Sequence, residues 1–178
     1  MSALRVLITG GGRGIGRAIA LRFADSGARV FVNFFIDREA AEKTARDVEL
    51  RGGVAHLVQA DLKEPGEITR MAGEVARVAG RLDVLVNNAA SGVLRGPLAL
   101  SPKQWDWVMN TNARPLLLCA QEAACLMSAG GRIVALTSLG SERVIPGYAA
   151  VGVSKAALET LTRYLAVELA PRGITVNA

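Results

Sequence analysis

A tyrosine and a lysine in the segment PGYAAVGVSKAALETL (146–161) have side chains suited to acid–base chemistry. Tyr148 and Lys155 stand seven residues apart in a stretch with a helical pattern. Seven residues turn an α-helix by about 700°, within about 20° of two full turns, so both side chains can share one face. A phenol can stabilise an oxygen that gains negative charge, and a nearby ammonium favours a polarised phenol. This pair is therefore the first candidate catalytic site.

The segment TGGGRGIG (9–16) has the features of a dinucleotide-binding loop. The GxGxxG spacing is absent, and the glycines instead follow the pattern GxxxGxG at Gly10, Gly14 and Gly16. We expect Gly10 to allow the tight turn after a strand, Gly14 to let the backbone approach a pyrophosphate, and Gly16 to let a helix pack closely. The helix expected from Ile15 onward would offer its first N–H groups to the phosphates. A purely structural turn does not need three glycines at these positions.

The choice between NADH and NADPH depends on the end of the second expected strand. An NAD site usually carries an acidic residue there, which binds the ribose hydroxyls. Phe34 stands at this position, and Asp37 follows three residues later, where it also suits the N-cap of the next helix. Arg13 in the glycine loop and Arg38 can each meet a 2′-phosphate. We therefore favour NADPH over NADH, with a solvated Arg38 in the first helical turn as the alternative.

Alternation of apolar strand patterns with helical patterns predicts the fold. The strands are apolar on both faces, which is typical of a parallel sheet covered by helices on each side. We expect six strands, at 4–9, 29–35, 54–60, 82–88, 131–138 and 173–178. We expect five helices, at 15–26, 38–51, 64–79, 102–127 and 148–170. No repeat or linker interrupts the pattern, so we predict one doubly wound α/β (Rossmann) domain over residues 1–178, with strand order 3-2-1-4-5-6.

Composition narrows the class of protein. The 178 residues suffice for one domain with a sizeable core. Hydrophobic residues make up 51%, but no charge-free run approaches the roughly 20 apolar residues of a membrane span, and the N-terminus lacks a signal-peptide pattern. We therefore expect a cytoplasmic protein. The net charge of +5 is scattered, which fits an anionic cofactor or an acidic partner better than nucleic acid. Cys119 and Cys125 fall on different helix faces, so we expect core packing and neither a disulfide nor a metal site.

Several motifs together resemble the short-chain dehydrogenase/reductase family over essentially the whole chain. They are the glycine loop, NNAA (87–90), a serine that closes the fifth strand and the Tyr–Lys helix. Four stretches look closer still to the NADPH-dependent type III enoyl-acyl-carrier-protein reductases: NNAASGVLR (87–95), WDWVMNTNA (105–113), CAQEAACLM (119–127) and YAAVGVSKAALETLTRYLAVEL (148–169). In that branch tyrosine and lysine follow the pattern Tyr-x6-Lys, as here, whereas carbonyl-reducing relatives have Tyr-x3-Lys. The nearer position is Val151 in this chain.

The resemblance implies roles for further residues near the reacting centre. Ser138 would be an active-site hydroxyl. Lys155 would lie near the nicotinamide ribose, where it orients the cofactor. Asn112 would support Lys155 through a water molecule, and the alternative is a helix-interior asparagine without such a role.

On the cofactor side, the resemblance places three residues after the third and fourth strands. Asp61 and Leu62 would lie at the adenine, with a helix-capping Asp61 as the alternative. Asn87 would lie along the cofactor.

The resemblance also implies a reaction. Reduction of an enoyl thioester places hydride on the β-carbon, while charge develops on the more distant carbonyl oxygen. A phenol moved to the start of the helix suits that oxygen, so we expect Tyr148 to stabilise the enolate during reduction of the C2=C3 bond of an enoyl-acyl-carrier-protein in fatty-acid synthesis. Two alternatives stay open: a carbonyl or 3-oxoacyl thioester reductase, against which Val151 counts, and an NADPH-binding paralogue with little activity.

Members of this family continue past the last expected strand, with about 250 residues in one domain. We therefore expect this chain to lack the last edge strand and the C-terminal segment that covers the substrate. Apolar residues around much of the helices 102–127 and 148–170 indicate burial against a partner. The resemblance implies a homo-oligomer, a tetramer in intact relatives.

Overall fold

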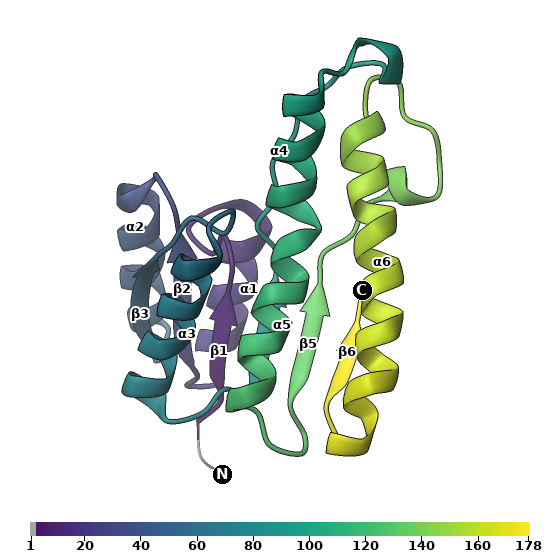
Figure 1. The fold of residues 1–178 in the computed structure, drawn as a ribbon. Coiled ribbons are helices and arrows are strands. Elements are labelled where there is room, and N and C mark those ends of the chain that lie inside the picture. Colours follow the sequence, from purple (N-terminus) through teal and green to yellow (C-terminus); the bar gives the residue numbers. More distant parts are fainter. Residues whose placement is uncertain (1–2) are drawn as a thin grey trace.

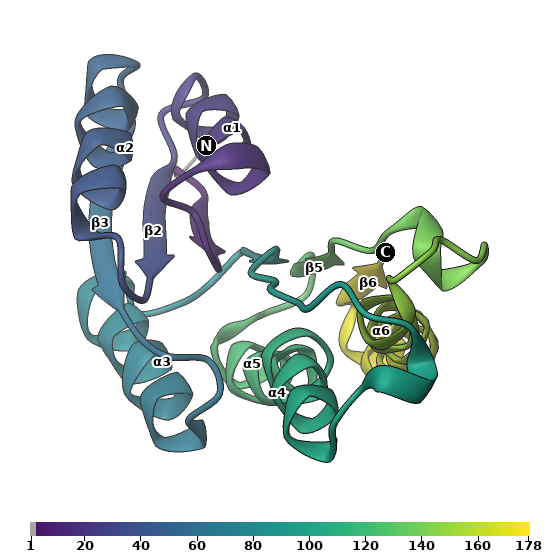
Figure 2. The same ribbon diagram turned by 90° about the horizontal axis from the view of Figure 1, so that it is seen from above.

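The computed structural model describes residues 3–178, which form a parallel sheet between two layers of helices (Figures 1 and 2). The six strands lie in the order β3-β2-β1-β4-β5-β6, which confirms the predicted fold and strand order. All neighbouring strands are parallel. The strands are β1 (Arg5–Ile8), β2 (Arg29–Phe34), β3 (Val54–Gln59), β4 (Val84–Asn87), β5 (Arg132–Ala135) and β6 (Thr175–Asn177).

Helices cover both faces of the sheet, as Figure 2 shows. On one face lie α1 (Gly14–Ala24) and α2 (Arg38–Leu50). On the other lie α3 (Pro65–Ala79), α4 (Pro102–Asn112), α5 (Arg114–Leu126) and α6 (Ala149–Leu169). Short 3-10 turns occur at η1 (Pro97–Ala99), η2 (Leu139–Ser141) and η3 (Ala170–Arg172). No helix within residues 3–178 combines the length and apolar character needed to cross a membrane.

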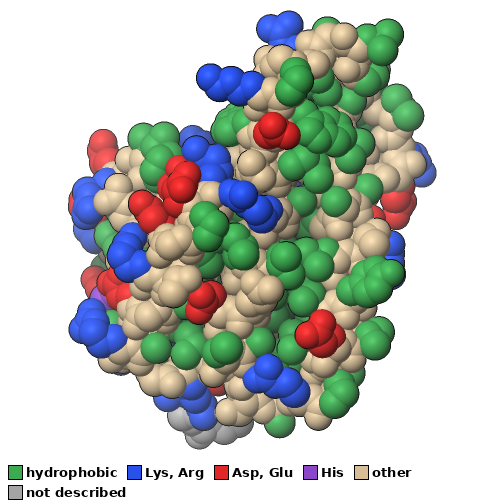
Figure 3. Space-filling view, viewed as in Figure 1, with side chains coloured by type: hydrophobic (Ala, Val, Ile, Leu, Met, Phe, Trp, Pro, Cys, Tyr) green, Lys and Arg blue, Asp and Glu red, His purple; other side chains and the backbone are tan. Residues whose placement is uncertain are grey.

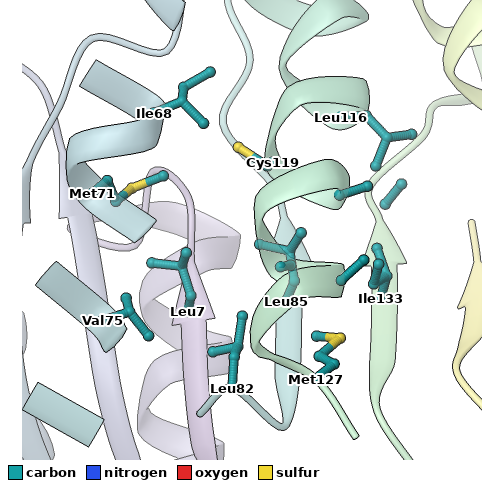
Figure 4. Packing of buried hydrophobic residues seen from close by; sticks show 14 of the residues in the cluster. Leu7, Ile68, Met71, Val75, Leu82, Leu85, Leu116, Cys119, Met127 and Ile133 are labelled. Carbon is teal, nitrogen blue, oxygen red and sulfur yellow. The ribbon is translucent and has the colours of Figure 1, made fainter. Parts of the chain in front are cut away.

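Each layer of helices has its own hydrophobic core, because alternate residues of a strand point to opposite faces of the sheet. Val6 and Val84 pack toward α1 and α2, whereas Leu7 and Leu85 belong to the core shared with α3, α5 and α6. Figure 4 shows this second core, in which side chains of α3 and α5 meet those of β1, β4 and β5. The two cores hold the carboxyl ends of the strands in fixed register.

One predicted helix, 102–127, is two helices in the structure. The break falls at Ala113, between the end of α4 and the start of α5. Pro115 explains it, because proline has no backbone N–H to bond to the carbonyl of Thr111 one turn earlier. The break makes Asn112 the last residue of α4 rather than a residue of a helix interior. The alternative of a helix-interior asparagine therefore does not match its position, while its role at Lys155 stays a prediction.

Candidate active site

Three loops meet at the carboxyl edge of the sheet, where open parallel sheets bind ligands. They are residues 9–13 after β1, 88–101 after β4 and 136–148 after β5, at the upper end of the strands in Figure 1. The N-termini of α1 and α6 adjoin the first and the third loop. Of the residues predicted to be catalytic, Ser138 and Tyr148 lie on the third loop, Lys155 lies about two turns into α6, and Asn112 ends α4.

The glycine loop has the backbone that a dinucleotide site requires. Gly10 and Gly14 have φ of +62° and +54°, a region that favours glycine. A Cβ on Gly16 would lie 2.4 Å from the carbonyl oxygen of Gly10, so only glycine lets α1 approach this closely. A Cβ on Gly14 would have no neighbour within 4 Å, which leaves open space over the N-terminus of α1. The N-cap residue Arg13 makes no side-chain cap hydrogen bond, so the first N–H groups of α1 can bind an anion.

Asn33 holds the glycine loop in place and was not anticipated from the sequence. Its Oδ1 accepts the Gly10 N–H at 3.2 Å, and its Nδ2 donates to the carbonyl oxygens of Val58 at 3.2 Å and Ala60 at 3.3 Å. Asn33 is buried in β2. A buried asparagine is stable only with such partners. An asparagine within an otherwise apolar strand is the signal that points to it.

A second network ties the glycine loop to the exit of β4. Thr9 Oγ1 accepts the N–H groups of Asn88 at 2.9 Å and Ala89 at 3.0 Å. The Asn88 amide nitrogen donates to the carbonyl oxygens of Thr9 at 2.8 Å and Gly10 at 3.1 Å. The NNAA motif therefore fixes the loop that leads to Gly14, the glycine with open space beside it.

Asn87, the residue before this network, has an amide without a hydrogen-bond partner. It is 1% exposed, and neither its oxygen nor its nitrogen is paired within the described part of the chain. An unsatisfied buried polar group costs about 1–3 kcal/mol. A polar ligand group that reaches Asn87 would relieve this cost, which agrees with the predicted place of Asn87 along a cofactor.

Tyr148 and Ser138 come together at the exit of β5. Tyr148 is the N-cap of α6, and its hydroxyl lies 3.4 Å from Ser138 Oγ. The Tyr148 ring packs against Gly140, where a Cβ would lie 2.5 Å from the ring. The structure thus brings the two predicted active-site hydroxyls together.

Lys155 lies on the same helix and is 4% exposed. Its Nζ donates to the carbonyl oxygen of Leu136 at 2.6 Å, two residues before Ser138. Burial lowers the pKa of Lys155 below its ordinary value. Because an ammonium has three donors, two stay available for a ligand.

Val151, at the position of the tyrosine in carbonyl-reducing relatives, is buried. It packs with Val108 and Ala150 in a small apolar cluster. A Cβ on Gly92 would lie 2.2 Å from Val151 Cγ2, so the loop after β4 presses directly on it. Val151 therefore fills space in the wall of the site and has no group for proton transfer.

Asn112, the last residue of α4, contacts both the loop after β4 and helix α6. It is fully buried, its Oδ1 accepts the Ser91 N–H at 2.9 Å, and its Nδ2 donates to Ser154 Oγ at 3.0 Å. Ser154 precedes Lys155 on α6 and was not among the predicted residues. Asn112 thus fixes both the loop after β4 and the helix turn that carries Lys155, while its water-mediated support of Lys155 stays a prediction.

The predicted 2′-phosphate side lies at the end of β2. Asp37 Oδ1 accepts the Ala40 N–H at 3.0 Å, which confirms Asp37 as the N-cap of α2. The Arg38 guanidinium lies 5.2 Å from the centroid of the Phe34 ring and 3.2 Å from Gln59 Oε1. Arg13 is exposed at the N-cap of α1. Arg13 thus adjoins Gly14, whereas Arg38 lies against side chains at the ends of β2 and β3.

Asp61 and Leu62 follow β3. Asp61 accepts the Lys63 N–H at 3.0 Å and pairs with Lys63 Nζ at 3.1 Å. The N-cap of α3 is Glu64, so the alternative prediction that Asp61 caps this helix is wrong. The Leu62 side chain is buried in the core, which leaves only its backbone for a ligand.

The two cysteines differ in environment. Cys119 is buried as predicted, and desolvation raises the pKa of its thiol to about 12. Cys125 is exposed, so the prediction of core packing is wrong for this residue: its position on α5 faces away from the sheet. Within residues 3–178 no cluster of His, Cys, Asp and Glu side chains has the arrangement of a metal site.

Known proteins resemble the chain in both sequence and structure. Residues 10–178 match a family model described as "Enoyl-(Acyl carrier protein) reductase". The chain is 48% identical over 172 residues to the 1-cyclohexenylcarbonyl-CoA reductase of Streptomyces collinus, which covers 97% of this chain and 61% of that protein. It is 40% identical over 176 residues to the 3-oxoacyl-[acyl-carrier-protein] reductase FabG of Staphylococcus aureus, which covers 97% of this chain and 71% of that protein.

A short-chain dehydrogenase from Burkholderia cenocepacia, solved in complex with NADP, has a TM-score of 0.94 and 39% identity, over 98% of this chain and 71% of that one. The chain thus spans 61% of the Streptomyces relative and 71% of the Staphylococcus relative. The matches agree with the sheet order, the glycine loop and the helix that carries Tyr148 and Lys155. On this evidence the chain belongs to the short-chain dehydrogenase/reductase family.

Proposed function

We propose that this chain provides the cofactor-binding and phenol-bearing side of a reductase that saturates the C2=C3 bond of an enoyl thioester with NADPH. The observation that carries the proposal is the 3.4 Å approach of the Tyr148 and Ser138 hydroxyls. Val151 stands where carbonyl-reducing relatives have tyrosine, and the other tyrosine, Tyr164, is 73% exposed further along α6. Tyr148 is therefore the phenol of this site.

The residues present fit NADPH. The open space at Gly14 and the uncapped N-terminus of α1 suit a pyrophosphate, and the unpaired amide of Asn87 suits a polar group of the cofactor. Arg13 and Arg38 would meet a 2′-phosphate, while Asp37 already caps α2. The Burkholderia relative was solved with NADP, which supports the same choice. When bound, NADPH supplies the hydride that the β-carbon receives.

Tyr148 would donate a hydrogen bond to the thioester oxygen as it takes on enolate charge, and Ser138 would hold the phenol or the same oxygen. The buried ammonium of Lys155 adds positive charge behind them. The name of the Streptomyces relative describes a thioester whose carbonyl is conjugated to a ring double bond, which supports this class of substrate.

We place the acyl group on acyl carrier protein, in fatty-acid synthesis, because the description of the matching family names that carrier and the net charge of +5 suits an acidic partner. A coenzyme A thioester is the alternative, by similarity to the Streptomyces relative. The similarity to FabG favours reduction of 3-oxoacyl thioesters as the second candidate function. The buried, apolar Val151 argues against it.

We also propose a homo-oligomer that covers the outer faces of α4 and α6. Figure 3 shows hydrophobic side chains gathered over α4, α5 and α6, whereas charged side chains concentrate over α2 and α3. The exposed large hydrophobic residues on these helices are Trp105, Trp107, Leu117, Val153, Tyr164 and Val167. A patch of this kind is typical of an interface.

Oxidation of NADPH separates the candidate reactions. We expect turnover with crotonyl thioesters and with 1-cyclohexenylcarbonyl-CoA, and little with acetoacetyl thioesters. The reverse preference would establish a carbonyl reductase and overturn the proposal. NADPH binding without oxidation of any substrate would identify a binding paralogue.

Tyr148→Phe tests the proposed phenol directly. We expect kcat for enoyl reduction to fall by roughly 10²-fold, since one acid or oxyanion donor is lost, while the dissociation constant of NADPH stays nearly unchanged. Tyr164→Phe is the matched control and should leave both quantities unaltered. Unchanged turnover in Tyr148→Phe would rule out the role given to this residue.

A further inference from the structure

A carboxylate behind the proposed active site has no part in the reaction as described so far. Glu159 lies on α6, four residues after Lys155, and its side chain points toward the exit of β5. Its Oε1 accepts hydrogen bonds from Ser141 Oγ at 2.5 Å and from Thr137 Oγ1. These hydrogen bonds, first that of Ser141 and then that of Thr137, lower the pKa of Glu159. The side chain is therefore an anion that binds two hydroxyls of one short loop.

The two hydroxyls flank Ser138. Thr137 precedes it, and Ser141 is the last residue of η2, the turn for which Ser138 is the N-cap. Ser141 Oγ also lies 2.7 Å from the Ser138 carbonyl oxygen, but a hydroxyl has a single proton. The bond to the carboxylate is shorter and charge-assisted, so it is the stronger one. The Ser138 carbonyl oxygen still accepts a hydrogen bond from the Ser141 N–H at 3.0 Å.

The turn that Glu159 binds contacts both hydroxyls of the proposed site. Ser138 Oγ accepts the Gly140 N–H at 3.3 Å and lies 3.4 Å from the Tyr148 hydroxyl. Gly140 forms the surface on which the Tyr148 ring rests. A shift of the turn would therefore change the distance between Ser138 and Tyr148.

Helix α6 begins next to Tyr148, and two of its later side chains form hydrogen bonds to this turn or to the residues just before it. Lys155 donates to the carbonyl of Leu136 before the turn, and Glu159 binds both sides of Ser138. We propose that Glu159 is a positioning residue, which holds the Ser138 hydroxyl at the Tyr148 hydroxyl by anchoring the turn after β5 to α6. This inference rests on the proposed function, in which the two hydroxyls act together.

Glu159→Ala tests the anchor by kinetics. We expect kcat for enoyl reduction to fall by about tenfold, because the turn loses two charge-assisted hydrogen bonds, with little change in the KM for NADPH. Glu159→Gln keeps the side-chain volume and one acceptor oxygen, so its kcat should lie between those of Glu159→Ala and the unmodified chain. The same variant tests the anchor if Glu159→Ala folds poorly. Glu168→Ala, an exposed glutamate on the same helix, is the control and should match the unmodified chain.

A double-mutant cycle distinguishes positioning from general stabilisation. If Glu159 acts through Ser138, Glu159→Ala adds little to the loss of kcat already caused by Ser138→Ala. A full additional tenfold loss in that background would overturn the inference.

Hydrogen exchange tests the anchor without any turnover. In Glu159→Ala, and to a smaller extent in Glu159→Gln, we expect faster amide exchange in residues 137–147 and unchanged exchange in residues 3–34. Unchanged exchange in 137–147 would overturn the anchor. If the unmodified chain reduces no thioester at all, the proposed function fails while this measurement still decides whether Glu159 holds the turn.

Discussion

Lys155 combines a charge with nearly complete burial, and this has a consequence for stability. Burial lowers its pKa in the folded state below the ordinary 10.5. Between the folded pKa and 10.5 the unfolded chain binds more protons, so the free energy of unfolding rises with pH in this window. The slope is at most about 1.4 kcal/mol per pH unit for one proton.

We therefore expect the unmodified chain to gain stability relative to Lys155→Met as the pH rises from the lowered pKa of Lys155 toward 10.5. Urea denaturation at several pH values measures the difference. Lys103→Met, a change at an exposed lysine, should show the same pH dependence as the unmodified chain. Parallel curves for the unmodified chain and Lys155→Met would contradict the assigned cause of the pKa shift.

The candidate site residues that could be predicted from the sequence are those that belong to a local sequence motif. Tyr148 and Ser138 are close in sequence as well as in space, and the structure brings them to 3.4 Å. Asn33 and Glu159 were not predicted, because their roles depend on partners across the fold. Asn33 binds carbonyl oxygens 25 and 27 residues away, and Glu159 binds a hydroxyl 22 residues away. The spacing of residues within a single helix or strand does not indicate contacts between residues of different elements.

The junction of β1 and α1 depends on one glycine more than on the others. A Cβ on Gly16 would lie 2.4 Å from the Gly10 carbonyl oxygen and 2.6 Å from Asn88 Nδ2. We expect Gly16→Ala to force α1 away from the loop, to cost about 1–3 kcal/mol of stability and to weaken NADPH binding. Chemical denaturation and fluorescence titration of NADPH measure these effects.

Gly73→Ala is the matched control for this prediction. Gly73 lies within α3, and a Cβ there would meet nothing within 4 Å. Alanine should therefore raise stability by about 0.5–1 kcal/mol, the ordinary gain for a helix interior, without effect on NADPH. Equal losses in both variants would show that close packing at Gly16 is not the cause.

The order of elements was predictable because strand and helix patterns alternate along the whole chain. The residues at which helices and strands begin and end were less predictable. The apolar residues of 102–127 read as one helix, although Pro115 is a local signal for the break at Ala113. The strand predicted at 131–138 ends at Ala135. Thr137 and Ser138 then leave the sheet toward the candidate site, which apolar periodicity alone does not show.

At the scale of the whole molecule, α6 presents an apolar face that the chain itself does not cover. Val153, Tyr164 and Val167 are 44%, 73% and 78% exposed. They are separated by eleven and three residues, so their directions around the helix axis differ by no more than about 60°. They form the face for which we propose a second copy of the chain.

The proposed interface would make the assembly sensitive to charge at one position. Val167→Arg would bury a guanidinium without a partner in the proposed contact, which costs several kcal/mol, so the assembly should dissociate into smaller species. Light scattering coupled to size-exclusion chromatography measures the mass. Leu50→Arg, at a residue 85% exposed on α2, is the control and should leave the mass unchanged. Because Val167 lies far along α6 from Tyr148, NADPH binding should survive dissociation. A mass that is the same for Val167→Arg and the unmodified chain would place the contact elsewhere.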